Sequence, residues 1–188
     1  EAFARMNADA AAVEAGYGGL TALPHLTGAS NPEYDPCARG VFCGATLQHG
    51  RAHFTRAVME SVACMLRRNL EQLTALGVDF NAVACMGGGA NSRVWLQIKA
   101  DVANKPMRPL RARESACLGA AILAGVGAGL FESVDWTPEE GMAGEIAAPD
   151  PVRRAACEAL YRRYVGLYEA LKPFFAQNAR IESEGLPR

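Results

Sequence analysis

Three consecutive glycines, Gly87 to Gly89, stand between a short apolar run and a segment with helical spacing. Glycine lacks a Cβ and tolerates positive φ, so the main chain at such a turn can approach a ligand closely. The following helix offers free N–H groups and the positive end of its dipole, which both favour an anion such as phosphate. Asn91 or Ser92 can cap that helix. The turn therefore predicts a nucleotide site, although a plain strand-to-helix connection has the same pattern.

The turn departs from two other phosphate-binding patterns. No Gly-Lys-Ser or Gly-Lys-Thr follows at the spacing of a P-loop. The dinucleotide pattern GxGxxG fails only at its last position, which is Ser92. After the next expected strand, Arg111 and Arg113 stand where an acidic residue would bind a ribose, and arginines there suit a 2′-phosphate. A nicotinamide-dependent oxidoreductase therefore stays open as an alternative.

His49 and His53 are four residues apart, so on a helix they would share one face and could bind a metal ion. No glutamate accompanies them in an HExxH pattern. We therefore expect these histidines to pack and to form hydrogen bonds at the start of a helix. We expect no metal ligand in this chain.

The composition is that of a folded protein without a strong overall charge. Half of the 188 residues are hydrophobic and the formal net charge is -1, which gives no field for nucleic acid or an anionic membrane. No stretch resembles a signal peptide, and the uncharged segment 115–131 is shorter than a membrane-spanning helix requires. The six cysteines are scattered singly, which favours reduced, mostly buried thiols. We therefore expect a cytoplasmic protein.

The hydrophobic periodicity predicts the elements that must position the glycine turn. Apolar residues at helical spacing predict helices over 1–15, 51–76, 94–102, 114–130 and 151–178. Short apolar runs predict strands over 20–23, 40–43, 81–86 and 107–110. The alternation of strands and helices predicts a layered α/β domain.

Three blocks of sequence carry a family resemblance. The first is G-G-G-A-N-S-R-V-W-L-Q-I-K-A-D-V over 87–102. The second comprises D-P-C-A-R-G-V-F over 35–42, H-G-R-A-H over 49–53 and M-E-S-V-A over 59–63. The third is E-S-A-C-L-G-A-A over 114–121. In their order and spacing these blocks resemble the FGGY family of carbohydrate kinases, especially its xylulokinase-like members.

The resemblance implies an actin-like, ribonuclease H-like ATPase fold with a mixed sheet flanked by helices, in which two domains close over ATP, Mg²⁺ and a sugar. Residues 1–188 would form the C-terminal, ATP-binding domain, with 1–50 facing the cleft and 151–178 forming its last helix. The N-terminal sugar-binding domain, with the carboxylate general base, would lie outside this chain. We therefore expect no catalytic residue here and no activity from the isolated chain. A homodimer stays open.

The same resemblance implies an ATP site formed by two groups of residues. Those against the α-phosphate and ribose would be Gly87, Gly88, Gly89 and Ala90. Those flanking the adenine would be Asn91 and Arg93.

Two further features of the chain bear on this resemblance. We expect the small residues around Gly119 to let their helix pack closely behind the glycine turn, and Glu114 to be a charge near the start of that helix rather than a catalytic acid. At 28–32 the chain has G-A-S-N-P where xylulokinases usually have G-E-R-T-P. Because two charges are replaced, the acceptor could be a xylulose-like ketose, a polyol or a related sugar.

The expected function is therefore that of an ATP-dependent sugar kinase. A non-catalytic, actin-like nucleotide-binding domain is the alternative from a different class. The nicotinamide-dependent oxidoreductase is the least favoured of the three.

Overall fold

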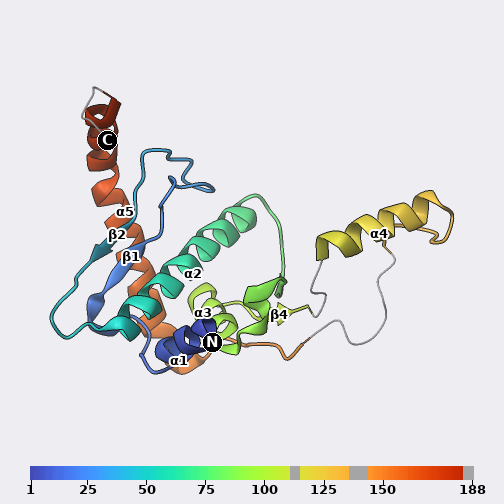
Figure 1. The fold of residues 1–188 in the computed structure, drawn as a ribbon, viewed down its shortest axis with the longest axis horizontal. Helices are drawn as coiled ribbons and strands as arrows, with labels where there is room; N and C mark the ends of the chain where they lie inside the picture. The colour runs from blue at the N-terminus through green and yellow to red at the C-terminus, as the bar shows by residue number, and fades with distance from the viewer. Residues whose placement is uncertain (111–114, 136–143, 184–188) are drawn as a thin grey trace.

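The computed structural model describes residues 1–110, 115–135 and 144–183 (Figure 1). The α-helices are α1 (Ala2–Ala11), α2 (Arg51–Ala75), α3 (Arg93–Ala103), α4 (Ser115–Gly127) and α5 (Arg154–Ser183). The strands are β1 (Thr21–Leu23), β2 (Val41–Cys43), β3 (Val83–Cys85) and β4 (Met107–Pro109). Short 3-10 helices are η1 (Tyr17–Gly19), η2 (Gly88–Asn91) and η3 (Pro151–Arg153). The predicted order of elements is confirmed, although α5 continues beyond its predicted end at 178.

The four strands form two separate pairs. β1 and β2 are antiparallel, with Thr21 opposite Cys43, whereas β3 and β4 are parallel, with Val83 opposite Met107. In Figure 1, α2 runs between the two pairs. The expectation of one mixed sheet is therefore wrong for the residues that the structure describes. The pairs stay apart because β1 packs against α2 and α5, whereas β3 and β4 share a core with α3.

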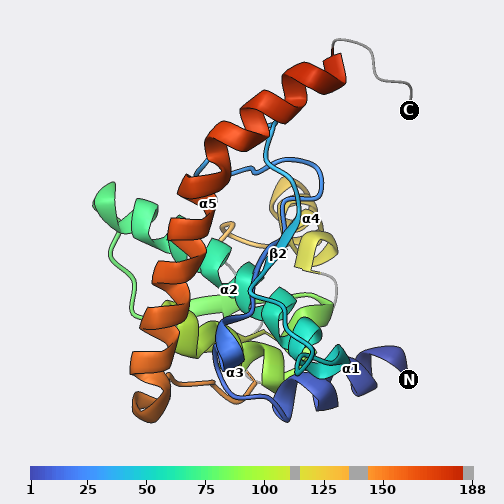
Figure 2. The same ribbon diagram turned by 90° about the vertical axis from the view of Figure 1, so that its left-hand side faces the viewer.

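The main hydrophobic core lies where α2, α3 and α5 meet, with α1 and β1 at its edge. α5 contributes a stripe at helical spacing, Leu160, Tyr164 and Tyr168, each at most 3% exposed. Burying a side chain of this size typically contributes about 1.5–3 kcal/mol. Figure 2 shows α5 running along the whole body, so this one helix joins the N-terminal strands to α3.

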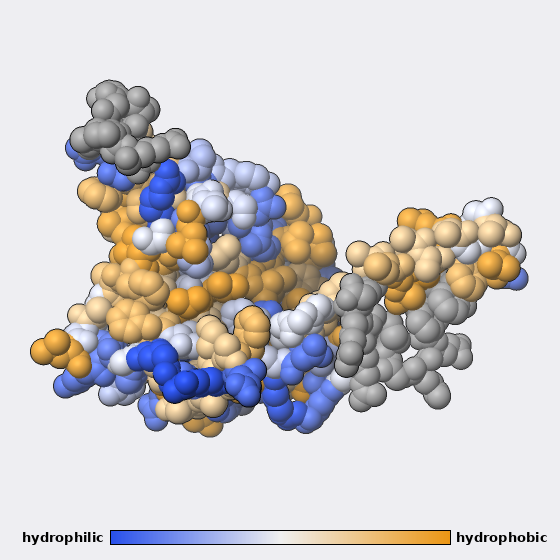
Figure 3. Space-filling model, in the orientation of Figure 1, coloured by the Kyte–Doolittle hydropathy of each residue, from blue (hydrophilic) through white to orange (hydrophobic). Residues whose placement is uncertain are grey.

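Helix α4 stands apart from this core. Figure 1 shows it projecting beyond β4, and Figure 3 shows a largely apolar surface on it. A Cβ added at Gly119 would meet no atom within 4 Å, so the expectation that Gly119 packs this helix behind the glycine turn is wrong. The close contact of α4 is instead with its own continuation, between Gly125 and the Phe131 ring. Glu114 lies outside the described residues.

Neither α4 nor any other described helix has the length and apolar character needed to cross a membrane. All six cysteines are free thiols, as expected. Only half of them are buried, namely Cys64, Cys85 and Cys157. Burial raises the pKa of Cys157 to about 11 and also raises that of Cys64. These two thiols are therefore poor nucleophiles at neutral pH.

Candidate functional site

The glycine turn joins the carboxyl end of β3 to the start of α3. Gly87 has a φ of 77°, in the left-handed region that favours glycine, and the single turn of η2 follows it. A Cβ added at Gly87 or Gly88 would meet no atom within 4 Å, so the space beside both residues is open. A Cβ at Gly89 would lie 3.0 Å from the indole ring of Trp95. The turn therefore has one open side and one side closed by Trp95.

Ser92 is the cap of α3. Its Oγ accepts a hydrogen bond from Trp95 N at 3.1 Å and donates one to Asn7 Oδ1 at 2.9 Å. Of the two predicted caps the structure thus selects Ser92, while Asn91 is exposed. The bond to Asn7 also ties α1 to the positive end of the α3 dipole. Sequence reasoning missed this bond because its partners are 85 residues apart.

Ala90 and Arg93 have opposite surroundings. Ala90 is buried in the small core beneath β3, β4 and α3, so it anchors the turn. The Arg93 guanidinium is exposed and forms an ion pair with Glu145, with Nη2 2.7 Å from Oε1. This pairing raises the pKa of Arg93 and lowers that of Glu145. Because water screens an exposed pair, a ligand can exchange with Glu145 at low cost.

Lys99 lies on the closed side of the turn. Its Nζ is 4.7 Å from the centroid of the Trp95 ring and 4.0 Å from the position of a Cβ on Gly89. Burial lowers the pKa of Lys99, and the neighbouring Cys85 thiol offsets part of that shift. Sequence reasoning missed this cation because Lys99 has no spacing pattern of its own within the Q-I-K-A-D-V segment.

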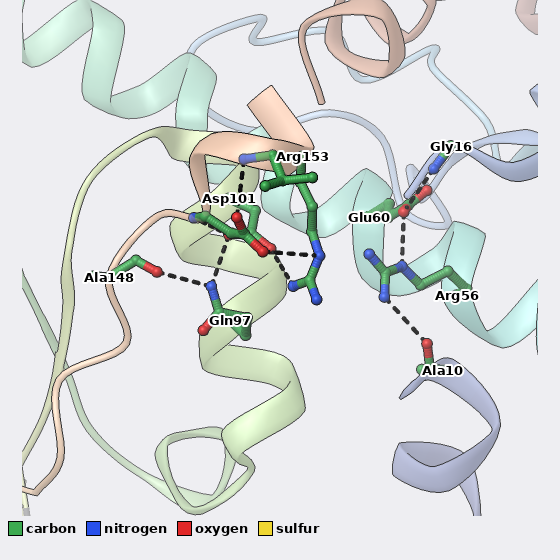
Figure 4. Close-up of polar contacts among 10 residues, drawn as sticks. Ala10, Gly16, Arg56, Glu60, Gln97, Asp101, Ala148 and Arg153 are labelled. Carbon is green, nitrogen blue, oxygen red and sulfur yellow. Dashed lines mark hydrogen bonds and ion pairs between the residues drawn. The ribbon is translucent and has the colours of Figure 1, made fainter. Parts of the chain in front are cut away.

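Asp101 ties α3 to η3, directly before α5 (Figure 4). Its Oδ1 accepts hydrogen bonds from Gln97 Nε2 at 2.7 Å and from Asp150 N at 2.9 Å. Its Oδ2 accepts one from Arg153 Nη1 at 3.0 Å. Three donors thus surround a carboxylate whose side chain is 1% exposed, and this arrangement holds α3 in place below the glycine turn.

A second buried carboxylate, Glu60, ties α2 to the segment between α1 and η1 (Figure 4). Its Oε1 accepts hydrogen bonds from Arg56 Nε at 2.7 Å and from Gly16 N at 3.0 Å. Arg56 Nη1 in turn donates to Ala10 O at 3.1 Å. Burial raises the pKa of the Glu60 carboxyl, whereas Arg56 and the Gly16 N–H offset part of that shift.

The two histidines have the structural roles that the sequence predicts. Gly50 N donates to His53 Nδ1 at 3.0 Å where α2 begins, and Thr46 N donates to His49 Nδ1 at 2.9 Å. The prediction of hydrogen bonding at a helix start is confirmed. Within the described ranges, no group of three or more His, Cys, Asp or Glu side chains is placed to hold a metal ion.

Comparisons with known proteins agree on one family. The family described as FGGY family of carbohydrate kinases, C-terminal domain, matches residues 2–128. The xylulose kinase of Staphylococcus epidermidis is 35% identical over 163 residues, which cover 86% of this chain and 32% of that protein. The glycerol kinase of Citrifermentans bemidjiense is 40% identical over 119 residues, 62% of this chain and 24% of that protein.

A solved structure also points to the xylulose kinases. The xylulose kinase from Rhodospirillum rubrum superimposes with a TM-score of 0.79 and 36% identity, over 93% of this chain and 34% of that one. This chain spans about a third of the length of the xylulose kinases that it matches. Its small sheets and helices fit part of the actin-like ATPase fold of these sugar kinases. The chain therefore belongs to the FGGY family of carbohydrate kinases.

Proposed function

We propose that this chain is the ATP-binding part of a kinase that transfers a phosphoryl group from MgATP to a ketose such as xylulose, or to a related polyol. Family membership and the names of the relatives, xylulose kinase and glycerol kinase, support this assignment. The observation that carries it is the open space beside Gly87 and Gly88, directly before a capped helix. An open glycine turn at a helix N-terminus suits the phosphates of a nucleotide.

In this proposal the main chain of 87–90 lies against the α-phosphate and ribose of ATP. Without a Cβ at Gly87 and Gly88, phosphate oxygens can reach the backbone N–H groups, and the positive end of α3 stabilises their charge. Asn91 and Arg93 flank the adenine. Arg93 is available for this role because its ion pair with Glu145 is exposed to water.

Phosphoryl transfer also requires a positioned acceptor, a general base and Mg²⁺. We propose that Mg²⁺ arrives bound to the nucleotide phosphates and that the base and the sugar-binding residues lie outside this chain. The chain alone would then bind nucleotide without turning it over. The segment G-A-S-N-P at 28–32 leaves the acceptor open among ketoses and polyols.

Nucleotide binding is tested with the variant Gly88→Val. The φ of Gly88 lies outside the left-handed region, and a Cβ at this position would meet no protein atom within 4 Å. The fold of the variant should therefore persist. We expect MgADP and MgATP to bind the unaltered chain in calorimetry, and valine to weaken binding about tenfold or more by filling the ligand's space. Gly166→Val, also in open space but on α5, is the matched control. Unchanged affinity in Gly88→Val would mean that the turn is only structural.

Catalysis is tested with the product of the complete reading frame, assayed with ATP against a panel of ketoses and polyols. Phosphorylation of one of them is the expected result. Retained ATP binding with no acceptor phosphorylated would favour the non-catalytic, actin-like alternative. Binding of NADPH in place of ATP would favour the nicotinamide-dependent alternative, whose arginines, Arg111 and Arg113, lie outside the described residues.

A further inference from the structure

A cavity of about 640 Å³ lies between the end of α1, the first turns of α3 and the start of α5. Small side chains leave this space open, since four of the residues that line it are alanines, Ala11, Ala12, Ala15 and Ala156. Of the described residues that line it, none belongs to the glycine turn. Small-molecule sites typically enclose about 300–1,000 Å³, so this volume is sufficient for a metabolite.

The charged side chains that line the cavity are three arginines and one glutamate, namely Arg56, Arg93, Arg153 and Glu14. Arg56 is 8% exposed and uses Nε and Nη1 for its bonds to Glu60 and to the end of α1. Arg153 donates a hydrogen bond from Nη1 to Asp101 Oδ2, and its Nε lies 3.6 Å from Asp150 Oδ2 in a second ion pair. Within the described part of the chain, the Nη2 atom of neither arginine donates a hydrogen bond. Figure 4 shows both guanidinium groups beside α3, with that of Arg56 pointing from α2 toward α3.

Two helix N-termini add positive potential to the cavity. α3 begins at Arg93, and η3 followed by α5 begins at Pro151, so the first turns of both helices border the space. The carbonyl end of α1 also borders it, but Arg56 already satisfies Ala10 O. Glu60, Glu145 and Asp101 each pair with one of the three arginines but do not line the cavity. The charged side chains of the wall itself, three arginines against Glu14, therefore favour an anion.

We propose that this cavity binds a small molecule with a phosphate or carboxylate group, held by Nη2 of Arg56 and Nη2 of Arg153. Guanidinium groups match the paired oxygens of both anions, and a nearly buried guanidinium binds them more strongly than an exposed one. Val13, Val94 and Ile98 line the same space and would contact the rest of the molecule. The cavity shares Arg93 with the proposed ATP site, but its lining contains no residue of the glycine turn.

Titration of the ¹⁵N-labelled chain tests this proposal, with inorganic phosphate in one arm and malonate in the other. We expect at least one anion to shift the Nε–Hε signals of Arg56 and Arg153, and the two arms tell phosphate from carboxylate chemistry. Arg153→Gln should weaken binding about tenfold or more, because a hydrogen bond between charged groups is lost. Arg162→Gln makes the same change on α5 outside the cavity lining and should leave the affinity unchanged.

A second variant covers the possibility that Arg153→Gln disturbs the contact with Asp101. Ala156→Leu keeps every polar contact of the cavity and fills part of its volume, so it should also weaken binding. The proposal is overturned if neither anion shifts the two arginine signals, or if both variants bind as tightly as the unaltered chain. Displacement of the anion by MgADP, or weaker anion binding in Gly88→Val, would also overturn it, because the cavity would then belong to the nucleotide site.

Discussion

Replacing Asp101 by asparagine should lower the free energy of unfolding by about 2–4 kcal/mol. Asparagine has the same shape, and its one oxygen can still accept the bonds from Gln97 Nε2 and Asp150 N. Its amide nitrogen would then face Arg153 Nη1, donor against donor. Losing the hydrogen bond between the charged groups of Asp101 and Arg153 costs about 1.5–3 kcal/mol. In addition, Gln97 Nε2 and Asp150 N would donate to a neutral amide oxygen, which is a weaker acceptor than a carboxylate. Because the Arg153 side chain is 47% exposed, it can turn to water, which limits the loss.

Urea unfolding followed by circular dichroism measures this effect. The slope of the unfolding free energy against urea concentration should stay unchanged, because the variant keeps the same fold. Asp79→Asn, at an exposed position, is the control and should change the unfolding free energy by less than about 0.5 kcal/mol. The double variant Asp101→Asn with Arg153→Gln should cost less than the sum of the single changes, because both remove the same bond. A loss below about 0.5 kcal/mol for Asp101→Asn, or full additivity, would refute the reasoning.

Two further predictions concern the N-terminal third of the chain. Burial lowers the pKa of His25, so the unfolded chain takes up a proton near the ordinary value of about 6.5 while the folded chain does so only at lower pH. Stability should therefore fall as the pH drops below about 6.5, and less so in His25→Phe; identical pH profiles in urea unfolding would contradict this. Gly18 and Gly19 both have positive φ, but only a Cβ on Gly18 meets His49 Nε2, at 2.5 Å. Gly19→Ala should cost about 1–2 kcal/mol and Gly18→Ala clearly more, and equal melting temperatures in calorimetry would argue against the clash.

Local features of this protein were accessible from the sequence. The apolar spacing in 51–76 predicts α2, and the glycine turn with Ser92 predicts where α3 begins. These features depend on side chains within one or two turns of each other, so the spacing of residue types is sufficient to reveal them. The candidate nucleotide residues are likewise contiguous along the chain, so their proximity required no tertiary information. The resemblance rests on the same local blocks, and family comparison agrees with it.

Long-range arrangements were accessible only from the tertiary structure. The pairing of β1 with β2 and of β3 with β4, and the separation of α4 from the core, depend on which surfaces meet in space.

The ion pair between Arg93 and Glu145 and the bond between Asp101 and Arg153 each join residues 52 positions apart. No periodicity links such partners. In the sequence, a charged residue that will form a buried ion pair cannot be told from one that stays exposed or caps a helix.

The cavity could not be predicted from the sequence for the same reason. Its alanines look like ordinary helix residues, and its arginines look like ordinary surface charges. By itself the sequence determined the elements and the glycine turn, since both arise from neighbouring residues. Which charges became buried, paired or turned toward a shared space was decided only when distant segments packed together.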